Sequence, residues 1–244
     1  MTKSKTLILL PTYNEAENLP PMLAAIHDNL PEADILVIDD NSPDGTGRIA
    51  DSASAKNAQI HVAHRPGKQG LGVAYRYGYQ WAVDQEDNGK PRYERIIQMD
   101  CDFSHSPGDL GRLEALLGTY PVVVGSRRAP NGGVVGWPLH RRLISSAGSF
   151  YARSVLSSPV RDLTAGFKGF RREALTALPL EKLNIDGFGF QIEVTAHLIA
   201  MSFSIHEMPI QFSDRTVGQS KMTAQIFVEA MLKVWKIRSS IRDL

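Results

Sequence analysis

Short apolar segments alternate with longer segments of helical periodicity along the first hundred residues. We expect strands at residues 6–10, 35–39, 60–64 and 95–99, and helices at about 17–29, 46–55 and 72–83. Apolar residues recur every three or four positions in the helical segments, whereas the strands are apolar almost throughout. Strands that alternate with helices pair in parallel through right-handed crossovers, and strands without polar alternation are buried on both faces. The pattern predicts an α/β fold with a mostly parallel, doubly wound central sheet flanked by helices.

The rhythm changes after about residue 130. A glycine-rich stretch is followed by a basic helix expected at Leu139 to Leu156, a helix at about 190–201, a strand near Ile205 to Phe212, the polar loop 214–221 and a C-terminal helix. No internal repeat, low-complexity tract or linker divides the chain. We therefore expect a single domain over residues 1–244, in which the second half elaborates a site built by the first.

Polar residues follow the expected strands. In open α/β sheets ligands bind outside the carboxyl ends of the strands, so the residues at these ends are candidates for a site. The segments concerned are 11–15, 39–42, 65–67, 100–102 and 125–127. Carboxylates and arginines dominate them. The pattern predicts a polar site along one edge of the sheet.

Composition narrows the class of protein only slightly. With 43% hydrophobic and 22% charged residues, the 244-residue chain is typical of one α/β domain or two small ones. Lys plus Arg number 27 against 26 Asp plus Glu, so net charge gives no reason to expect a nucleic-acid partner. The single Cys101 excludes an internal disulfide and fits a reducing compartment.

Apolar segments long enough for a membrane are not found in the sequence. The apolar run at 7–10 is ended by Pro11 before it reaches the length of a signal-peptide core. Nowhere are there about 18 consecutive apolar residues, which a spanning helix would need. We expect any membrane contact to be peripheral.

Two carboxylates stand one residue apart at the end of the strand at 95–99. Asp100 and Asp102 at positions i and i+2 of a strand would project to the same side. Mg²⁺ and Mn²⁺ prefer such oxygen ligands and usually complete their coordination with phosphate oxygens and water. The motif predicts a metal that bridges a diphosphate.

A structural alternative for this motif stays open. The aspartates could cap the following helix, with Ser104 or Ser106 as further N-cap residues and Pro107 in its first turn. For a DxD motif alone this is the simpler interpretation. The second acidic pair, at 39–40, favours the metal, because two acidic strand ends repel each other unless a cation or a hydrogen-bonded ligand lies between them.

Other motifs are weak or absent. The stretch RPGKQGLG at 65–72 resembles a phosphate-binding loop, but it lacks the spacing of a Walker or dinucleotide-binding motif. No HExxH, CxxC or GxSxG sequence occurs. Zinc hydrolases and serine esterases are therefore not leading candidates.

Eight motifs in order along the chain carry a family resemblance. They are PTYNE at 11–15, VIDDNSPDGT at 37–46, GLGVAY at 70–75, MDCDFSH at 99–105, GSR at 125–127, DLTAGF at 162–167, FQIE at 190–193 and PIQFSDRTVGQSK at 209–221. Together they resemble the dolichyl (polyprenyl) phosphate mannose synthases, which are inverting family 2 glycosyltransferases with a GT-A fold. The resemblance implies a nucleotide-sugar and metal-binding half at 1–130 and an acceptor-binding half at 131–244.

The resemblance implies roles for residues near the nucleotide. It places Pro11, Tyr13, Glu15, Ile38 and Asp40 in the guanine-nucleotide pocket. A carboxylate suits the N–H donors of guanine or the ribose hydroxyls. Residues 14–15 also suit the start of the next helix, and the two interpretations are compatible.

The metal and phosphate roles are also implied by the resemblance. Asp100 and Asp102 would hold Mg²⁺ or Mn²⁺, Ser104 would be an additional ligand, and the backbone of Cys101 would approach the nucleotide. Cys101 replaces the alanine usual in the family. The residues implied to contact phosphates are Arg127, Arg215 and Lys221, with Gly218 as a hinge of their loop, and those implied to hold the acceptor phosphate are Arg127, Arg141 and Ser145. An isolated Arg or Lys is otherwise most often a solvated surface cation.

The implied activity is transfer of mannose from GDP-mannose to a polyprenyl phosphate with inversion, with Asp102, Arg127 and Arg215 as the catalytic residues. Alternatives are the same reaction with UDP-glucose, an inactive nucleotide-binding subunit that recruits partners to membranes, and a cytosolic polysaccharide transferase. The segment 138–161 has four arginines and no acidic residue among apolar positions, as an interfacial helix would. The C-terminal helix fits membrane docking or core packing equally well. We expect peripheral association with the cytoplasmic face of a membrane, with a small membrane-anchor protein as a further candidate partner.

Overall fold

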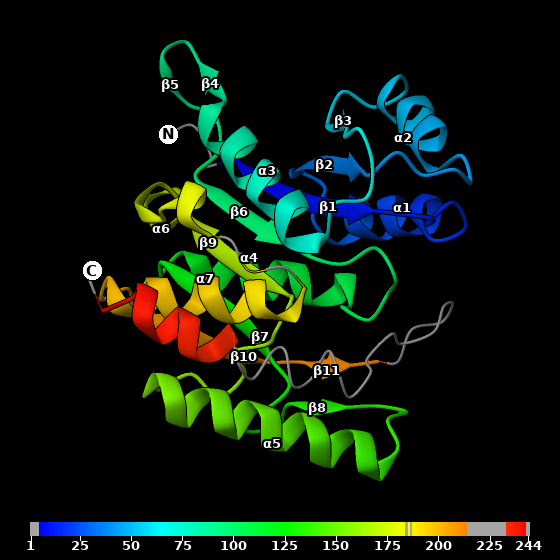
Figure 1. Ribbon diagram of the computed structural model, residues 1–244. Coiled ribbons are helices and arrows are strands. Elements are labelled where there is room, and N and C mark those ends of the chain that lie inside the picture. The colour runs from blue at the N-terminus through cyan, green and yellow to red at the C-terminus, as the bar shows by residue number, and fades with distance from the viewer. Residues whose placement is uncertain (1–4, 184, 186, 214–232, 243–244) are drawn as a thin grey trace.

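The computed structural model describes residues 5–183, 185, 187–213 and 233–242 (Figure 1). Within these residues the central feature is a seven-stranded sheet of order β10-β7-β9-β6-β1-β2-β3. Its strands are β1 (Thr6–Thr12), β2 (Asp34–Asp39), β3 (Ile60–His64), β6 (Arg95–Gln98), β7 (Val122–Ser126), β9 (Lys168–Arg171) and β10 (Ile205–Pro209). All neighbours pair in parallel except β9, which is antiparallel to both β6 and β7. The predicted mostly parallel sheet is confirmed.

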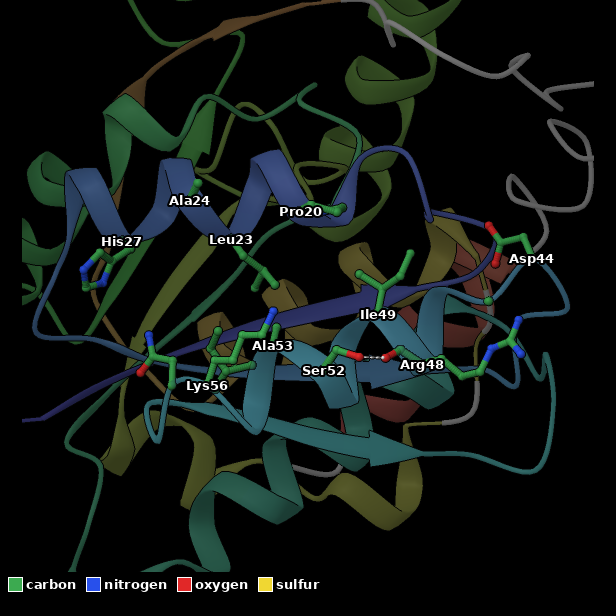
Figure 2. Close-up of a pocket in the computed structure, with 13 residues that line it drawn as sticks. Pro20, Leu23, Ala24, His27, Asp44, Arg48, Ile49, Ser52, Ala53 and Lys56 are labelled. Atoms are coloured by element: carbon green, nitrogen blue, oxygen red, sulfur yellow. Dashed lines mark hydrogen bonds between the residues drawn. The ribbon is translucent and has the colours of Figure 1, made fainter.

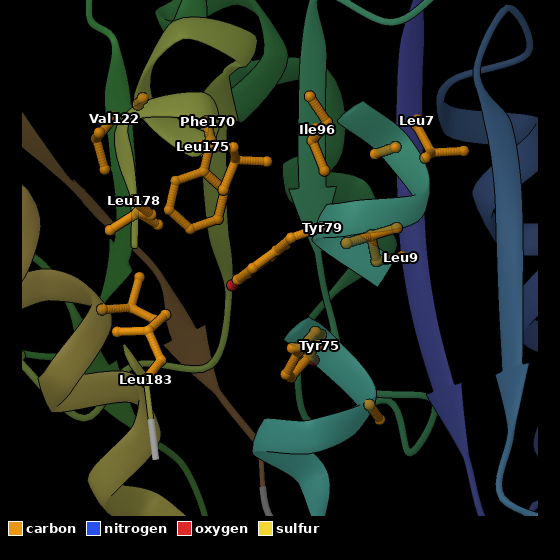
Figure 3. Packing of buried hydrophobic residues seen from close by; sticks show 14 of the residues in the cluster. Leu7, Leu9, Tyr75, Tyr79, Ile96, Val122, Phe170, Leu175, Leu178 and Leu183 are labelled. Carbon is orange, nitrogen blue, oxygen red and sulfur yellow. The ribbon is translucent and has the colours of Figure 1, made fainter. Parts of the chain in front are cut away.

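Helices cover both faces of this sheet. They are α1 (Leu19–Asn29), α2 (Thr46–Ser54) and α4 (Leu110–Leu117) on one face, and α3 (Leu71–Asp84), α6 (Arg172–Ala177) and α7 (Phe188–Ala200) on the other. Alternate residues of β1 serve the two cores, since Leu7 and Leu9 pack toward α3 while Ile8 and Leu10 pack toward α1. Figure 3 shows Tyr79 of α3 in this core between Leu7 and Leu9 of β1 on one side and Phe170 of β9 on the other. This burial on both faces explains why the strands carry no polar alternation.

Two of the differences between the structure and the sequence-based elements concern strands in or beside the central sheet. β9 was not predicted, because a four-residue strand that begins with Lys168 and Gly169 has no apolar run. The strand expected near Ile205 to Phe212 is divided into β10 and β11 (Gln211–Phe212). β11 pairs with β8 (Gly133–Val134) in a separate two-stranded sheet. The chain leaves the central sheet at Ile210, whose carbonyl accepts a hydrogen bond from the Gly133 N–H.

The remaining elements are small. They are the hairpin of β4 (Glu86–Asp87) and β5 (Lys90–Pro91) and the 3-10 turns η1 (Pro107–Asp109) and η2 (Leu180–Lys182). The hairpin extends away from the sheet beyond α3 (Figure 1). None of the predicted site residues lies in these elements.

The basic helix α5 (Leu139–Leu156) has the predicted bounds and runs along one side of the molecule (Figure 1). Ala152 and Val155 on its inner face join a third core with Ile192 of α7 and with Val234 and Ile237 of the helical residues 233–240. The described part of the C-terminal helix therefore packs into the molecule. Among the described residues no helix has the length and apolar character needed to cross a bilayer.

Candidate active site

The carboxyl ends of five parallel strands meet at one edge of the sheet, as predicted. The segments that follow β1, β2, β3, β6 and β7 begin near Tyr13, Asp40, Arg65, Asp100 and Arg127. β6 and β7 share a direction because each is antiparallel to the strand β9 between them. Residues from distant parts of the chain are thereby gathered at the place where α/β sheets bind ligands.

Asp100 and Asp102 lie in a turn rather than in a strand, because β6 ends at Gln98. The turn is closed by two local hydrogen bonds: the Ser104 N–H donates to Asp102 Oδ1 at 3.0 Å, and the Asp100 N–H donates to His105 Nδ1 at 3.1 Å. Phe103 takes a left-handed conformation with φ of 59°. The argument from strand alternation is therefore wrong for this pair, and the turn determines where the two carboxylates stand.

The carboxylate of Asp100 is oriented from α3. Tyr75 is fully buried and its hydroxyl donates to Asp100 Oδ1 at 3.0 Å. The ring of Tyr75 is stacked on Phe190 of α7. Burial, together with the charge of Asp100, holds the pKa of Tyr75 well above its ordinary value, so the hydroxyl remains a donor. Asp100 keeps about a quarter of its side chain exposed, at 24%, and can still meet a ligand.

The residues of this turn fit a hard divalent cation. Ser104 is buried, and its Oγ has no hydrogen-bond partner, which leaves an oxygen available beside the two aspartates. Among the described residues no three or more His, Cys, Asp or Glu side chains form a metal-binding group. Two carboxylates and a hydroxyl therefore match a cation that takes its other ligands from a bound diphosphate, rather than a site closed by protein alone.

His105 is a functional residue that the sequence analysis did not single out. Because its Nδ1 accepts the Asp100 N–H, the ring proton stands on Nε2. The ring is stacked on Phe167, with centroids 5.4 Å apart, and meets Phe212 edge to face at 5.5 Å. Burial lowers the pKa of His105, which keeps the ring neutral. His105 thus fixes the turn against two other segments of the edge.

Cys101 between the two aspartates is buried and has no disulfide partner. Burial, with a further contribution from the charge of Glu15, raises the pKa of its thiol well above the ordinary value. The thiol is therefore protonated and unreactive. Its burial agrees with the small alanine that the family resemblance leads us to expect at this position.

The predicted nucleotide residues do not all face one space. Tyr13 is partly exposed with Lys68 Nζ 4.0 Å from its ring centroid. The Glu15 N–H donates to Thr46 Oγ1 at 2.9 Å, which ties the segment after β1 to α2. The side chain of Ile38 is fully buried in the core beneath α3. The Ile38 side chain therefore offers no exposed surface to a nucleotide. The nucleotide roles of Pro11, Tyr13, Glu15 and Asp40 stay predictions.

Both members of the acidic pair after β2 have partners within the protein. Asp40 Oδ1 accepts a hydrogen bond from Arg65 Nη1 at 2.7 Å, and both side chains are nearly buried. Asp39 accepts hydrogen bonds from the N–H and hydroxyl of Ser42. Burial raises the pKa of Asp40, although Arg65 opposes the shift. The argument that this pair requires a cation is wrong, because Arg65 arrives from the adjacent strand β3.

Arg127 is held in a buried ion pair with Asp162. Its Nε and Nη2 each lie 2.7 Å from a carboxylate oxygen of Asp162, and Nη2 also donates to Thr164 Oγ1 at 2.7 Å. Burial would raise the pKa of Asp162, but the charge and hydrogen bonds of Arg127 outweigh it and lower the pKa to about 2. Two of the three guanidinium nitrogens of Arg127 are thus occupied by the protein itself.

The acceptor-side candidates lie on and beside α5. Arg141 stacks over Trp137, with the guanidinium carbon 4.0 Å from the ring centroid. The hydroxyl of Ser145 accepts a hydrogen bond from Arg128 Nη2 at 2.9 Å. Arg128 was not among the predicted site residues. Its position directly after Arg127 was the available signal, but its partner Ser145 is 17 positions away.

Gln98, Lys168 and Gln191 form a buried hydrogen-bond network near the carboxyl end of β6. Lys168 Nζ donates to the carbonyl and side-chain oxygens of Gln191, at 2.9 and 2.8 Å. Gln98 donates to the same side-chain oxygen at 2.9 Å. Burial lowers the pKa of Lys168 to about 7. Gln98 of this network lies two residues before Asp100 and thus links the network to the acidic turn. The sequence signal for the network was this polar residue in an otherwise apolar strand.

A groove of about 650 Å³ lies between α1 and α2 (Figure 2). Its apolar floor includes Leu23 and Ala53, and its rim carries His27, Arg48 and Lys56. The residues that line it include none of the predicted site residues. The predicted Arg215, Gly218 and Lys221 fall outside the described part of the chain, so their roles stay predictions.

The mostly parallel sheet with an acidic turn after β6 is the GT-A architecture of nucleotide-sugar glycosyltransferases. Residues 7–178 match the family described as glycosyl transferase family 2. The chain belongs to this family and is a glycosyltransferase. The family resemblance predicted from the motifs is confirmed.

Curated relatives match over nearly their full length. The chain is 42% identical over 230 residues to an undecaprenyl-phosphate mannosyltransferase from Micrococcus luteus, covering 94% of this chain and 92% of the relative. It is 41% identical over 241 residues to a polyprenol monophosphomannose synthase from Mycolicibacterium smegmatis, covering 97% of this chain and 89% of the relative.

Solved structures confirm the fold. Glucosyl-3-phosphoglycerate synthase from Mycobacterium tuberculosis, in complex with Mn²⁺, UDP and glucosyl-3-phosphoglycerate, matches with a TM-score of 0.64 at 18% identity, covering 98% of this chain and 80% of that one. A mannosyltransferase from Pyrobaculum calidifontis in complex with GDP-mannose and Mn²⁺ matches with a TM-score of 0.64 at 15% identity, covering 100% of this chain and 66% of that one.

Proposed function

We propose that this enzyme transfers mannose from GDP-mannose to a polyprenyl phosphate, with inversion at the anomeric carbon. The carrying observation is the similarity, across more than nine tenths of this chain, to two proteins named for mannosyl transfer to polyprenyl phosphates. The Pyrobaculum calidifontis neighbour that holds GDP-mannose and Mn²⁺ supports the choice of donor and of a divalent cation.

Asp100, Asp102 and Ser104 would hold the divalent cation. When bound there, Mg²⁺ or Mn²⁺ supplies positive charge that stabilises the departing diphosphate. Tyr75 and His105 keep the Asp100 carboxylate and backbone in place through their hydrogen bonds. Tyr13 and Glu15, which follow the neighbouring strand β1, would contact the nucleoside.

The acceptor phosphate is the nucleophile. It is already an anion at neutral pH, so no protein side chain has to remove a proton from it. One of its oxygens forms the new bond to the anomeric carbon, the bond from that carbon to GDP breaks, and the electron pair leaves with the diphosphate. The protein contributes alignment of the two anions and neutralisation of their charge. Arg141 and Ser145 on α5 would hold the acceptor. The family resemblance implies that Arg215 and Lys221 contact the diphosphate.

A donor and acceptor panel tests the proposal. We expect labelled mannose to pass from GDP-mannose to polyprenyl phosphate in the presence of Mg²⁺ or Mn²⁺, and turnover with UDP-glucose to be at least about tenfold lower, since mismatched polar groups of the base would be left unpaired. Turnover is measured as radioactivity extracted into organic solvent. Faster transfer from UDP-glucose would replace the donor, and binding of nucleotide without any transfer would indicate an inactive recruitment subunit.

The surface of α5 supports membrane docking of the enzyme. The described residues include eight large, exposed hydrophobic side chains, and six of them lie on α5 or near it. Leu139, Leu143, Ile144 and Phe150 are on α5, Val135 precedes it, and Trp235 donates a hydrogen bond to Tyr151 of α5. Leu139, Leu143 and Phe150 share one helix face because they are four and seven residues apart. This face points away from the core formed by Ala152 and Val155. We propose that it rests on the cytoplasmic face of a membrane or on a small membrane-anchor protein.

Acidic substitutions on this face test the docking. We expect Leu143→Glu with Phe150→Glu to lower association with anionic vesicles containing polyprenyl phosphate by at least about tenfold, because apolar contacts are lost and charge repulsion is added. Flotation of the protein with the vesicles measures this association. Tyr77→Glu, at a residue 42% exposed on α3, is the matched control and should float as the unmodified protein does. Equal flotation of all three proteins would refute direct docking of α5 on the membrane.

A further inference from the structure

Gln98 is the last residue of β6 and a polar residue with no exposed surface. Its Nε2 donates hydrogen bonds to the Gly166 carbonyl at 2.6 Å and to Gln191 Oε1 at 2.9 Å. Because a carbonyl oxygen can only accept, the NH2 group of the Gln98 amide must face Gly166. The amide oxygen of Gln98 points the other way, where it accepts a hydrogen bond from the hydroxyl of Tyr79. Both polar atoms of the Gln98 side chain therefore have partners.

The partners of Gln98 are themselves held in place. Lys168 lies opposite Gln98 in the antiparallel pair of β6 and β9, and its Nζ donates to Gln191 Oε1 at 2.8 Å. The ring of Tyr79 meets Phe170 edge to face, with centroids 5.5 Å apart. Turning the Gln98 amide over would place its oxygen against two acceptor oxygens in a buried place, so one orientation of the amide is strongly favoured. Gln98 is thus fixed from α3 and from α7.

Gly166 joins this network to the acidic turn of Asp100 and Asp102. A methyl group placed on Gly166 would lie 3.1 Å from His105 Cε1 and 3.7 Å from Asp100 Oδ2, so the backbone of the glycine packs directly against both residues. The next residue, Phe167, is stacked on the ring of His105. The position of the Gly166 backbone therefore determines how much room the Asp100 carboxylate has.

Two tyrosines of α3 hold two residues of the segment that leaves the sheet at β6. Tyr75 donates to Asp100 Oδ1 at 3.0 Å, and Tyr79 donates to Gln98 Oε1. The two tyrosines are four positions apart and so lie on the same face of the helix. Both are fully buried, and both rings are stacked on Phe190 of α7. Helix α3 thus contacts the Asp100 carboxylate directly and also supports it indirectly, through Gln98.

We propose that Gln98 is a positioning residue of the cation site. Its amide fixes the Gly166 backbone beside Asp100. Tyr79 and Gln191 fix the orientation of that amide. This inference rests on the cation site of the proposed function and extends it, because it assigns a role to a buried side chain that would not touch the cation itself. Without the Gln98 amide, the Gly166 backbone and the Asp100 carboxylate lose their fixed spacing, so the cation binds more weakly.

Mn²⁺ binding to the full chain, measured by electron paramagnetic resonance with GDP present, tests this assignment. We expect Gln98→Met to weaken Mn²⁺ binding about 10- to 100-fold, the usual effect of losing an outer hydrogen-bond partner of a metal site. Methionine is unbranched and flexible, so it can fill the space of the glutamine. The transfer rate should fall with the cation, whereas the apparent KM for polyprenyl phosphate should change less than about twofold. Tyr79→Phe, which removes a single hydrogen bond to Gln98, should weaken Mn²⁺ binding about two- to tenfold.

Tyr93→Phe is the matched control. It also removes a buried tyrosine hydroxyl that donates to a buried side chain, in this case Asp34 Oδ2 at 2.7 Å. Tyr93 precedes β6 and Asp34 begins β2, so this hydrogen bond lies at the amino ends of the strands, away from the acidic turn. Tyr93→Phe should lower the thermal stability of the protein as Tyr79→Phe does, but it should bind Mn²⁺ as the unmodified enzyme does.

Thermal unfolding shows whether each variant is folded. If Gln98→Met does not fold, Tyr79→Phe carries the test. Unchanged Mn²⁺ affinity in the folded variants overturns the assignment, and so does an equal loss of affinity in Tyr93→Phe, which would indicate general destabilisation. Mn²⁺ binding without any mannosyl transfer by the unmodified enzyme overturns the proposed function alone. Absence of Mn²⁺ binding to the unmodified enzyme overturns the cation site and the assignment together.

Discussion

Asp102→Asn is expected to lower mannosyl transfer about a thousandfold at saturating Mg²⁺ or Mn²⁺, because loss of a cation ligand removes several kcal/mol of charge stabilisation from the reaction. The substitution keeps the size of the side chain. The carbonyl oxygen of asparagine can still accept the Ser104 N–H, as Asp102 Oδ1 does at 3.0 Å. We therefore expect the turn and the fold to survive, so that the loss reports on the cation and not on unfolding.

The measurement is the rate of transfer from labelled GDP-mannose, with Mn²⁺ binding followed independently by electron paramagnetic resonance. The control is Asp51→Asn, since Asp51 is an exposed carboxylate on α2 that contacts His64 at 2.9 Å. Asp51→Asn should bind Mn²⁺ and transfer mannose as the unmodified enzyme does. Full activity and full Mn²⁺ binding in Asp102→Asn would show that the acidic turn only shapes the loop, as a capping role would require.

The pattern of apolar residues was sufficient to predict the parallel strands of the central sheet. Residues 7–10 are apolar without interruption because every one of them is completely buried between two helical layers. The expected position of Asp100 and Asp102 at the common edge followed from the direction of the strands. β9 escaped prediction because its first residue is Lys168, a polar residue that is buried in the structure through hydrogen bonds to Gln191 of the distant helix α7.

The partners of charged residues could not be predicted in the same way. The acidic pair after β2 was expected to need a cation, yet Asp40 is paired with Arg65, 25 positions away. The ion pair of Arg127 with Asp162, 35 positions away, was not predicted either, and the predicted contact of Arg127 with phosphates stays a prediction. The local sequence identifies the charged residue and the strand end at which it lies. The pairing depends on which strands become neighbours, and that order, with β9 inserted between β6 and β7, has no local signature.

Breaking the Arg127–Asp162 pair is expected to lower the free energy of unfolding more than any other substitution proposed for this protein. Asp162 has no exposed surface and Arg127 is 11% exposed. Removing one partner leaves a buried charge uncompensated, which costs about 3–5 kcal/mol. We expect Arg127→Gln to lower the free energy of unfolding by this amount in chemical denaturation at pH 7. Glu173→Gln, which breaks the exposed pair with Arg171, should cost no more than about 1 kcal/mol.

The pH dependence of stability separates this structural role of Arg127 from a phosphate-binding role. The pKa of Asp162 is lowered from 3.8 to about 2, so its contribution to stability is complete above the ordinary value and is lost as the pH falls from about 4 toward 2. The variant with both Arg127→Gln and Asp162→Asn should lose less stability than Arg127→Gln alone, because no charge is left unpaired, and should lack this acid transition. If Arg127 were chiefly a phosphate ligand, Arg127→Gln would reduce transfer while leaving unfolding at pH 7 and at pH 3 unchanged.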